Sequence, residues 1–153
     1  MNRGMAFTGN RKRQVLVVDD EHINREMLGY IIKQKYEVIY AENGEEALKI
    51  MKESGKKLSL VMLDLMMPVM DGFEVLKKMQ EDPGLSAIPV IVLTSEKSAE
   101  VDSLRLGASD FITKPYDMPE VILARVKRII ELSEDRLIIE ATERDHLTGL
   151  YTK

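Results

Sequence analysis

The fold is decided by the stretch Asp64-Leu65-Met66-Met67-Pro68-Val69-Met70-Asp71-Gly72, in which a carboxylate ends an apolar run and a Pro/Gly turn follows. Three further apolar runs also end in polar residues, namely Asp19-Asp20, Thr94 and Lys114. If the four runs are parallel strands of one sheet, their carboxyl ends meet at one edge. Three carboxylates, a hydroxyl and an ammonium then share a pocket that suits a divalent cation and a phosphoryl group.

Apolar runs recur along the chain at regular intervals and predict five strands. These are Val15–Val18, Val38–Ala41, Leu58–Leu63, Val90–Leu93 and Ser109–Thr113. The stretches between them have helical spacing, as in Ile23, Met27 and Ile31. Continuous apolar strands that alternate with amphipathic helices are typical of a parallel sheet covered on both faces. We therefore predict a doubly wound α/β domain with a five-stranded parallel sheet over residues 13–131.

The predicted helix ends are marked by capping residues. Three pairs place a capping oxygen three residues before a glutamate, namely Asn43 with Glu46, Asp71 with Glu74, and Asp117 with Glu120. Gly107 stands where a helix should stop before the last strand. These positions support the division into five strand-helix repeats.

The last predicted helix is longer than one small sheet can cover. From Pro119 to about Arg144 the sequence has no glycine and no internal proline. Apolar residues fall at heptad-like spacing, namely Leu123, Val126, Ile130, Leu137 and Ala141. We expect residues 132–144 to form a helical linker whose apolar stripe needs a partner helix or a following domain. The alternative is a solvated helix that frays at its end.

Composition limits the possible functions. The 153 residues, 17.4 kDa, correspond to one domain plus an appendage. No run reaches the roughly 18–20 apolar residues of a membrane span, and Met1 to Gln14 lacks the continuous apolar core of a signal peptide. The absence of cysteine excludes disulfides and thiol chemistry. We expect a cytoplasmic protein without membrane contact.

Charge is unevenly distributed. Residues 1–12, which we expect to form a flexible arm, are basic, and Arg13 follows them. Without its four basic residues up to Arg13, the chain changes from net charge −4 to −8. A body of this charge is poorly suited to binding nucleic acid.

The predicted pocket carries a specific chemistry. Three neighbouring carboxylates (Asp19, Asp20 and Asp64) repel one another, and hard oxygen ligands favour Mg²⁺, with Mn²⁺ as a substitute. Asp64 can then attack phosphorus as a nucleophile. Lys114 and Thr94 would be drawn toward the new phosphoryl oxygens, which makes the pocket a switch. The Lys114-Pro115 bond is a candidate for a cis peptide that fixes the direction of the lysine.

These residues together resemble the receiver domain of two-component response regulators. Asp19-Asp20 matches the acidic pair, Asp64 the phosphoacceptor, Thr94 the switch hydroxyl, Phe111 the switch aromatic and Lys114-Pro115 the lysine with its proline. The resemblance implies the flavodoxin-like receiver fold. It also implies Mg²⁺ bound by Asp20, Asp64 and the backbone carbonyl of Met66, with Asp19 acting through water.

The resemblance implies partners as well. The phosphoryl donor would be a histidine kinase, a phosphotransfer protein or a small donor such as acetyl phosphate. The domain would be a signalling module with self-catalysed phosphorylation and not an enzyme in the usual sense. A homodimer would form through the fourth helix, the last strand and the fifth helix, or through the long C-terminal helix. Because the apolar Met66 side chain cannot orient an attacking water, we expect slow loss of the phosphoryl group.

Residues 145–153, Asp145-His146-Leu147-Thr148-Gly149-Leu150-Tyr151-Thr152-Lys153, resemble the opening segment of GGDEF domains. This second resemblance implies a receiver joined by its linker helix to a diguanylate cyclase-like output domain. The chain ends before any catalytic residue of such a domain could appear.

Two other functions compete with this interpretation. Phosphatases of the haloacid-dehalogenase kind also use an aspartyl nucleophile, but they carry a second acid two residues later, where this chain has Met66. A pseudo-receiver would serve as a protein-interaction module without phosphorylation. The complete set of Asp19, Asp20, Asp64, Thr94 and Lys114 argues against that alternative.

Overall fold

The computed structural model describes residues 13–54, 57–116 and 118–149. Strands and helices alternate strictly along the chain. The strands are β1 (Gln14–Val18), β2 (Glu37–Ala41), β3 (Leu58–Asp64), β4 (Val90–Thr94) and β5 (Asp110–Thr113). The helices are α1 (His22–Ile32), α2 (Gly44–Ser54), α3 (Gly72–Glu81), α4 (Lys97–Arg105) and α5 (Pro119–Gly149).

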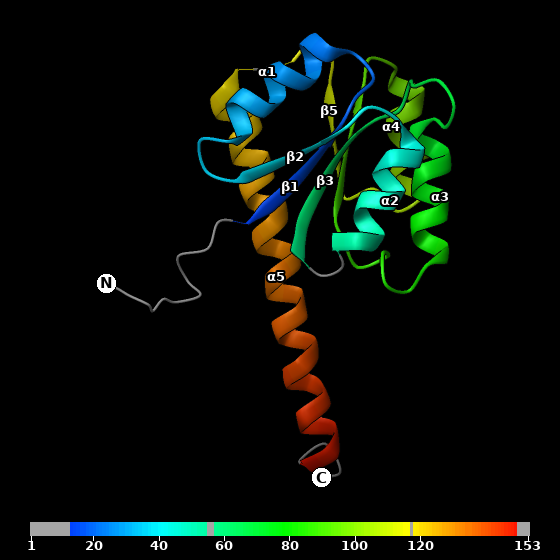
Figure 1. The fold of residues 1–153 in the computed structure, drawn as a ribbon. Coiled ribbons are helices and arrows are strands. Elements are labelled where there is room, and N and C mark those ends of the chain that lie inside the picture. Colours follow the sequence, from blue (N-terminus) through cyan, green and yellow to red (C-terminus); the bar gives the residue numbers. More distant parts are fainter. Residues whose placement is uncertain (1–12, 55–56, 117, 150–153) are drawn as a thin grey trace.

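The five strands form one parallel sheet in the order β2-β1-β3-β4-β5. Helices α1 and α5 cover one face, and α2, α3 and α4 cover the other (Figure 1). From β1 the chain adds β2 on one side, and then β3, β4 and β5 on the other. A doubly wound sheet binds its ligand where this order switches, in the crevice beyond the carboxyl ends of β1 and β3. The predicted flavodoxin-like fold is confirmed.

The core is divided into two layers by the sheet. Alternate residues of each central strand face opposite layers, as the pleat requires, so that Leu16 and Val18 join one cluster and Val15 and Val17 the other. The first cluster packs against α2, α3 and α4, and the second against α1 and α5. Because both faces are covered, β1 and β4 are apolar along nearly their whole length, which explains why periodicity alone predicted a parallel sheet.

The predicted strand ends agree with the structure to within a residue. Strands β3 and β4 each include the polar residue that follows the apolar run, Asp64 and Thr94 respectively. The cap at Asn43 is confirmed by a 2.8 Å bond from the Glu46 backbone N–H to its side-chain oxygen. Asp71 likewise accepts from the Glu74 N–H at 3.0 Å. The predicted cap at Asp117 lies outside the described residues.

Gly107 ends the turn after α4 with φ +108°, a conformation that residues with a Cβ rarely adopt. The predicted helix stop is therefore confirmed. Val69 also has a positive φ, +69°, in the loop after β3. The Met70 N–H bonds the Pro68 carbonyl across it at 2.7 Å, which closes a tight turn and strains the branched Val69.

Helix α5 continues beyond the sheet and ends at Gly149, five residues past the predicted end near Arg144. Residues 120–148 contain neither glycine nor proline, so nothing in the backbone chemistry stops the helix earlier. Its buried stripe differs slightly from the predicted one. Four residues face the sheet, namely Ile122, Val126, Ile129 and Ile130, whereas Leu123 is only partly buried. The predicted apolar stripe continues at Leu137 and Ala141, but the structure does not describe the side chains of these two residues.

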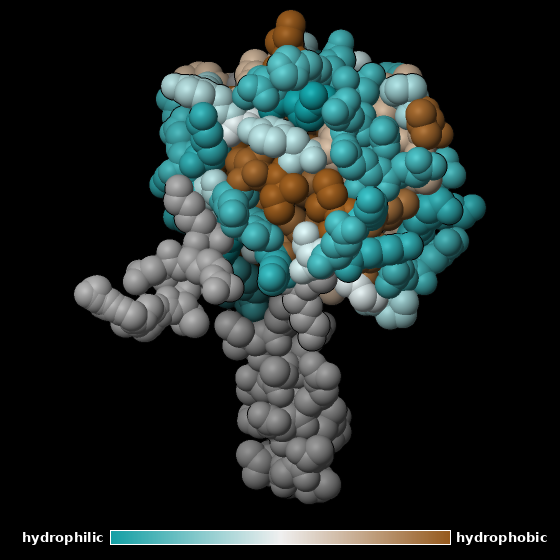
Figure 2. Space-filling model, viewed as in Figure 1, coloured by the Kyte–Doolittle hydropathy of each residue, from teal (hydrophilic) through white to brown (hydrophobic). Residues whose placement is uncertain are grey.

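The amphipathic pattern read on α1 was only partly right. Ile31 is buried, but Ile23 is 79% and Met27 42% exposed. The residues that face the sheet are instead Leu28, Ile31 and Ile32, which pack in the cluster between the sheet and helices α1 and α5. Apolar side chains also gather over the outer edge of the sheet, where Val38 and Ile39 of β2 are only partly buried (Figure 2).

An ion pair joins Arg13, the residue before β1, to α5. The Arg13 guanidinium donates to both carboxylate oxygens of Glu134, at 2.6 and 3.0 Å. This fork geometry is the strongest arrangement for an arginine-carboxylate pair.

Among the described residues, no helix has the length and apolarity needed to span a bilayer.

Candidate functional site

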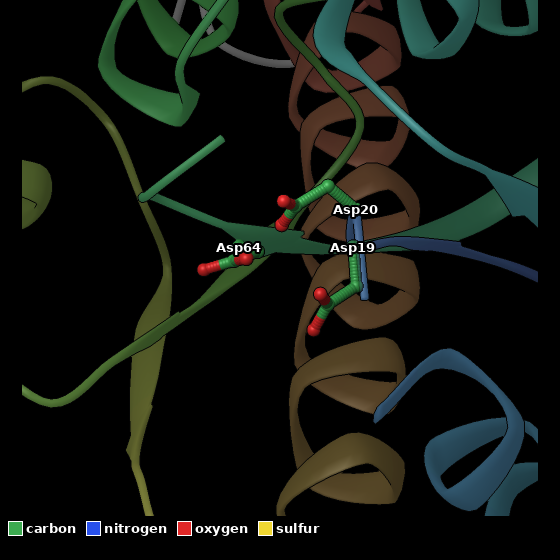
Figure 3. Close-up of side chains that lie close together, drawn as sticks. All are labelled: Asp19, Asp20 and Asp64. Carbon is green, nitrogen blue, oxygen red and sulfur yellow. The ribbon is translucent and has the colours of Figure 1, made fainter. Parts of the chain in front are cut away.

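Three carboxylates gather at the carboxyl ends of the two central strands, as the sequence predicted. Asp19 and Asp20 follow β1, and Asp64 is the last residue of β3 (Figure 3). One carboxylate oxygen from each lies within 4.8 Å of the others. Asp19 and Asp64 are buried and Asp20 is exposed, so the cluster opens to solvent on the side of Asp20. The set of ligands is all oxygen, which fits a hard divalent cation.

Backbone contacts hold the two acid-bearing loops in place. The Glu21 N–H donates to Asp19 Oδ1 at 2.9 Å, and the Met66 N–H donates to Asp64 Oδ1 at 3.2 Å. The Arg25 guanidinium, one turn into α1, bonds the Asp19 backbone carbonyl at 2.8 Å. These contacts leave Asp19 Oδ2 buried and without a hydrogen-bond partner among the described residues. A buried carboxylate oxygen of this kind calls for a cation or a water.

Lys114 provides the positive charge of the site. Its Nζ lies 3.1 Å from Asp64 Oδ1 and 3.9 Å from Asp19 Oδ2. The Lys114 N–H bonds the Thr94 carbonyl at 2.9 Å, which ties the ends of β4 and β5 together. The Lys114-Pro115 peptide bond is cis, as the sequence suggested.

Burial disfavours the charged form of both inner acids. Burial and then the neighbouring Asp19 charge raise the pKa of Asp64 to about 6, although Lys114 opposes the shift. Burial likewise raises the pKa of Asp19, while its hydrogen bond from Glu21 and the charge of Lys114 act in the other direction. One ammonium therefore does not fully compensate the buried carboxylates, and a divalent cation would.

This imbalance predicts a pH-dependent stability. The folded protein binds more protons at Asp64 than the unfolded chain between about pH 4 and pH 6, because the folded pKa is the higher one. As the pH rises from about 4 to about 6, we expect the free energy of unfolding of wild type in EDTA to fall by on the order of 2 kcal/mol relative to that of Asp64→Asn. Urea unfolding of both proteins at several pH values measures this difference. A constant difference between wild type and variant would contradict the prediction.

Thr94 and Phe111, predicted as switch residues, lie on the two strands beyond Asp64. Thr94 is buried, and its hydroxyl oxygen accepts from the Glu96 N–H at 3.1 Å. Phe111 is partly buried and packs against the cluster beneath α2, α3 and α4. On the neighbouring helix, Glu100 of α4 accepts a 3.0 Å bond from the Thr113 hydroxyl, which connects α4 to β5. The Thr94–Glu96 bond thus reaches the residue before α4, and the Thr113–Glu100 bond joins α4 to β5.

Met66 has an exposed side chain, 62% accessible, next to the carboxylates. Its backbone N–H already bonds Asp64, so the loop is held close to the site at this residue. Sequence reasoning missed two contributors: Arg25, through its bond to the Asp19 carbonyl, and Tyr116, whose buried hydroxyl feels the charges of Asp19 and Asp64, which raise the pKa of the phenol. The position of Tyr116 directly after Lys114-Pro115 places the residue near the site, but nothing in the sequence marks its hydroxyl as buried without a partner.

Comparison with known proteins agrees with this geometry. The family model described as "Response regulator receiver domain" matches residues 15–127. The alkaline phosphatase synthesis transcriptional regulatory protein PhoP of Bacillus subtilis is 37% identical over 138 residues, which cover 90% of this chain and 56% of the relative. The chain spans about half the length of most of the curated relatives it matches most strongly.

Solved structures show the same architecture. The chemotaxis protein CheY4 of Vibrio cholerae is 30% identical, with a TM-score of 0.70 over 77% of this chain and 98% of that one. A structure named "probable two-component system response regulator/GGDEF domain protein" is 27% identical, with a TM-score of 0.73. The similarity covers 79% of this chain and 50% of that protein.

Proposed function

The chain belongs to the response regulator receiver domain family, and from this premise we propose that Asp64 accepts a phosphoryl group in a Mg²⁺-dependent reaction. The observation that carries the proposal is the position of Asp64, buried between Lys114 and the two other carboxylates at the carboxyl end of the central strand. The donor would be a histidine kinase, a phosphotransfer protein or acetyl phosphate.

The transfer would be a displacement at phosphorus. An Asp64 carboxylate oxygen forms the new P–O bond while the P–N bond of phosphohistidine, or the P–O bond of acetyl phosphate, breaks. The leaving group keeps the bonding electrons. Asp64 must be ionised to attack, and Lys114 stabilises the charge that spreads over the phosphoryl oxygens.

The residues present fit a magnesium ion. Asp19, Asp20 and Asp64 supply carboxylates within 4.8 Å of one another, and the buried Asp19 Oδ2 lacks a hydrogen-bond partner among the described residues. We propose Asp20, Asp64 and the Met66 carbonyl as ligands, with Asp19 acting through water. Bound there, the cation would offset the repulsion that raises the pKa of Asp64.

The proposed output follows from the contacts around Thr94. Once Asp64 carries phosphate, Thr94 would leave the Glu96 N–H to bond the new oxygens, and Phe111 and α4 would rearrange. The change would alter the surface of α4, β5 and α5 and the pairing of the part of α5 that continues beyond the sheet. We propose that a homodimer forms there in the cytoplasm and that residues 145–153 lead into a GGDEF-type output domain.

The test is intact mass after incubation with acetyl phosphate and MgCl₂. We expect wild type to gain one phosphoryl group and Asp64→Asn to gain none. Size-exclusion light scattering on the same samples reports dimerisation. No gain in wild type, together with no response to beryllium fluoride, would favour the pseudo-receiver, a pure interaction module.

Met66 provides a prediction about the lifetime of the phosphoryl group. Its exposed thioether has no hydrogen-bond donor and is only a weak acceptor, so it orients a water that attacks the acyl phosphate poorly. We expect Met66→Asn to shorten the half-life several-fold, because the amide can orient that water. Decay of the phosphorylated mass over time measures both proteins, and Met66→Leu is the matched apolar control. Equal half-lives for Met66→Asn and Met66→Leu would disprove the role.

A further inference from the structure

Two buried polar side-chain atoms have no hydrogen-bond partner within the part of the chain that the structure describes. One is Asp19 Oδ2 and the other is the hydroxyl oxygen of Tyr116. A buried hydroxyl without a partner costs about 1–3 kcal/mol, so its presence needs an explanation. Phenylalanine would fill the same space without this cost.

Both atoms belong to the same end of the sheet. Tyr116 follows Lys114 by two residues, and the Lys114 Nζ lies 3.9 Å from Asp19 Oδ2. The Tyr116 ring packs against the apolar cluster between the sheet and α1 and α5. On its outer side, the ring lines a groove together with Met27, Ile31 and Pro119. The ring is thus anchored in the core.

The electrostatic environment of the hydroxyl agrees with this placement. Burial, followed by the negative charges of Asp19, Asp64 and Glu21, raises the pKa of the Tyr116 phenol above its ordinary value. The phenol therefore stays protonated at neutral pH and can act as a hydrogen-bond donor. The other buried side-chain atom without a partner among the described residues is an acceptor, Asp19 Oδ2.

We propose that Tyr116 is a positioning residue of the metal site, whose hydroxyl donates through one water molecule to Asp19 Oδ2. The two atoms do not form a direct hydrogen bond, and a bridging water would satisfy both of them. Asp19 then has both oxygens fixed, Oδ1 by the Glu21 N–H at 2.9 Å and Oδ2 by Tyr116. This inference rests on the proposed function, because it assigns Tyr116 to the same magnesium site.

The consequence is a difference in metal affinity. Groups that orient a metal-binding carboxylate contribute about 10- to 100-fold to affinity. We expect Tyr116→Phe to weaken Mg²⁺ binding by about tenfold, the lower end of that range, because its contact is made through water. The stability of the metal-free protein should not decrease, since the variant removes a buried hydroxyl that lacks a direct partner and keeps the ring.

The experiment is a titration of the chain with MgCl₂, followed by the NMR shifts of the Asp19 and Asp20 amides. Wild type, Tyr116→Phe and Tyr36→Phe are compared, together with their urea unfolding in EDTA. Tyr36 is the matched control because its ring is buried in the same cluster, just before β2 and so at the opposite end of the sheet from the three aspartates. Weaker binding in Tyr116→Phe alone, with unchanged metal-free stability, is the expected result.

Three outcomes would overturn the inference. Equal affinity in wild type and Tyr116→Phe removes the role of the hydroxyl and leaves the proposed function intact. A loss of affinity that is matched by a loss of metal-free stability, or shared by Tyr36→Phe, assigns Tyr116 to packing. Absence of Mg²⁺ binding by wild type would overturn the proposed function together with the inference.

Discussion

Replacing Lys114 with methionine is expected to lower the free energy of unfolding of the metal-free protein by about 2–3 kcal/mol at pH 8. The Lys114 ammonium lies 3.1 Å from Asp64 Oδ1, and both Asp64 and Asp19 are almost completely buried. Removing one partner of a buried ion pair costs about 3–5 kcal/mol because the other charge stays buried. The 22% exposure of the Lys114 side chain places the expected loss below that range.

The conditions that reverse this loss identify its cause. At pH 5 the Asp64 carboxyl of the variant takes up a proton, so the difference from wild type should shrink. Saturating MgCl₂ should shrink it at pH 8 as well, because the cation replaces the missing positive charge. Urea unfolding at both pH values, with EDTA or MgCl₂, measures these effects.

Lys127→Met is the matched control for this experiment. Lys127 forms an exposed pair with Glu131 at 4.0 Å along α5, and such pairs contribute at most about 0.5 kcal/mol. A loss in Lys114→Met that is the same at both pH values and with both additives would contradict the electrostatic explanation. The lysine would then matter through the packing of its aliphatic chain.

The parts of this molecule that the sequence predicted are those governed by short-range chemistry. Strands buried on both faces must be apolar along their length, so β1, β3 and β4 stood out together with the polar residues at their ends. Because all strands are parallel, those ends had to meet at one edge. The grouping of Asp19, Asp64 and Lys114 followed from that argument alone.

The parts that were not predicted depend on how the elements pack. The spacing of Ile23 and Met27 is helical, yet these side chains are exposed because the packing of α1 selects a different stripe. The buried hydroxyl of Tyr116 could not be distinguished from an ordinary core aromatic before its neighbours were known. The positive φ of Val69 is equally invisible, since no residue preference marks a valine for that conformation.

Close contact between α3 and β3 gives the second large prediction, at Gly72. A Cβ on Gly72 would lie 2.6 Å from the Asp64 carbonyl oxygen and 2.7 Å from the Leu65 Cα. Both are backbone atoms and cannot swing aside as a flexible side chain can. The Gly72 N–H also bonds the Leu65 carbonyl at 3.0 Å, which fixes the start of α3 against the end of β3.

We therefore expect Gly72→Ala to lower the free energy of unfolding by about 3 kcal/mol, the upper part of the range for overpacked sites. Alanine favours a helix over glycine by about 0.5–1 kcal/mol, which is too small to offset the overlap. Urea unfolding in EDTA measures the loss. Gly84→Ala is the control, because the nearest atom there is a side-chain oxygen of Asp82 at 3.3 Å.

The same substitution connects packing to function, because the atom that the new Cβ would overlap belongs to the proposed phosphoacceptor. If the overlap moves the end of β3, the Asp64 carboxylate shifts away from Lys114 and from the other two acids. A displacement of about 1 Å at a reacting group can lower a rate about 100-fold. We expect phosphoryl uptake from acetyl phosphate, followed by intact mass, to slow at least tenfold in folded Gly72→Ala and to stay unchanged in Gly84→Ala. Normal uptake with lowered stability would show instead that α3 moves and that β3, with Asp64, keeps its place.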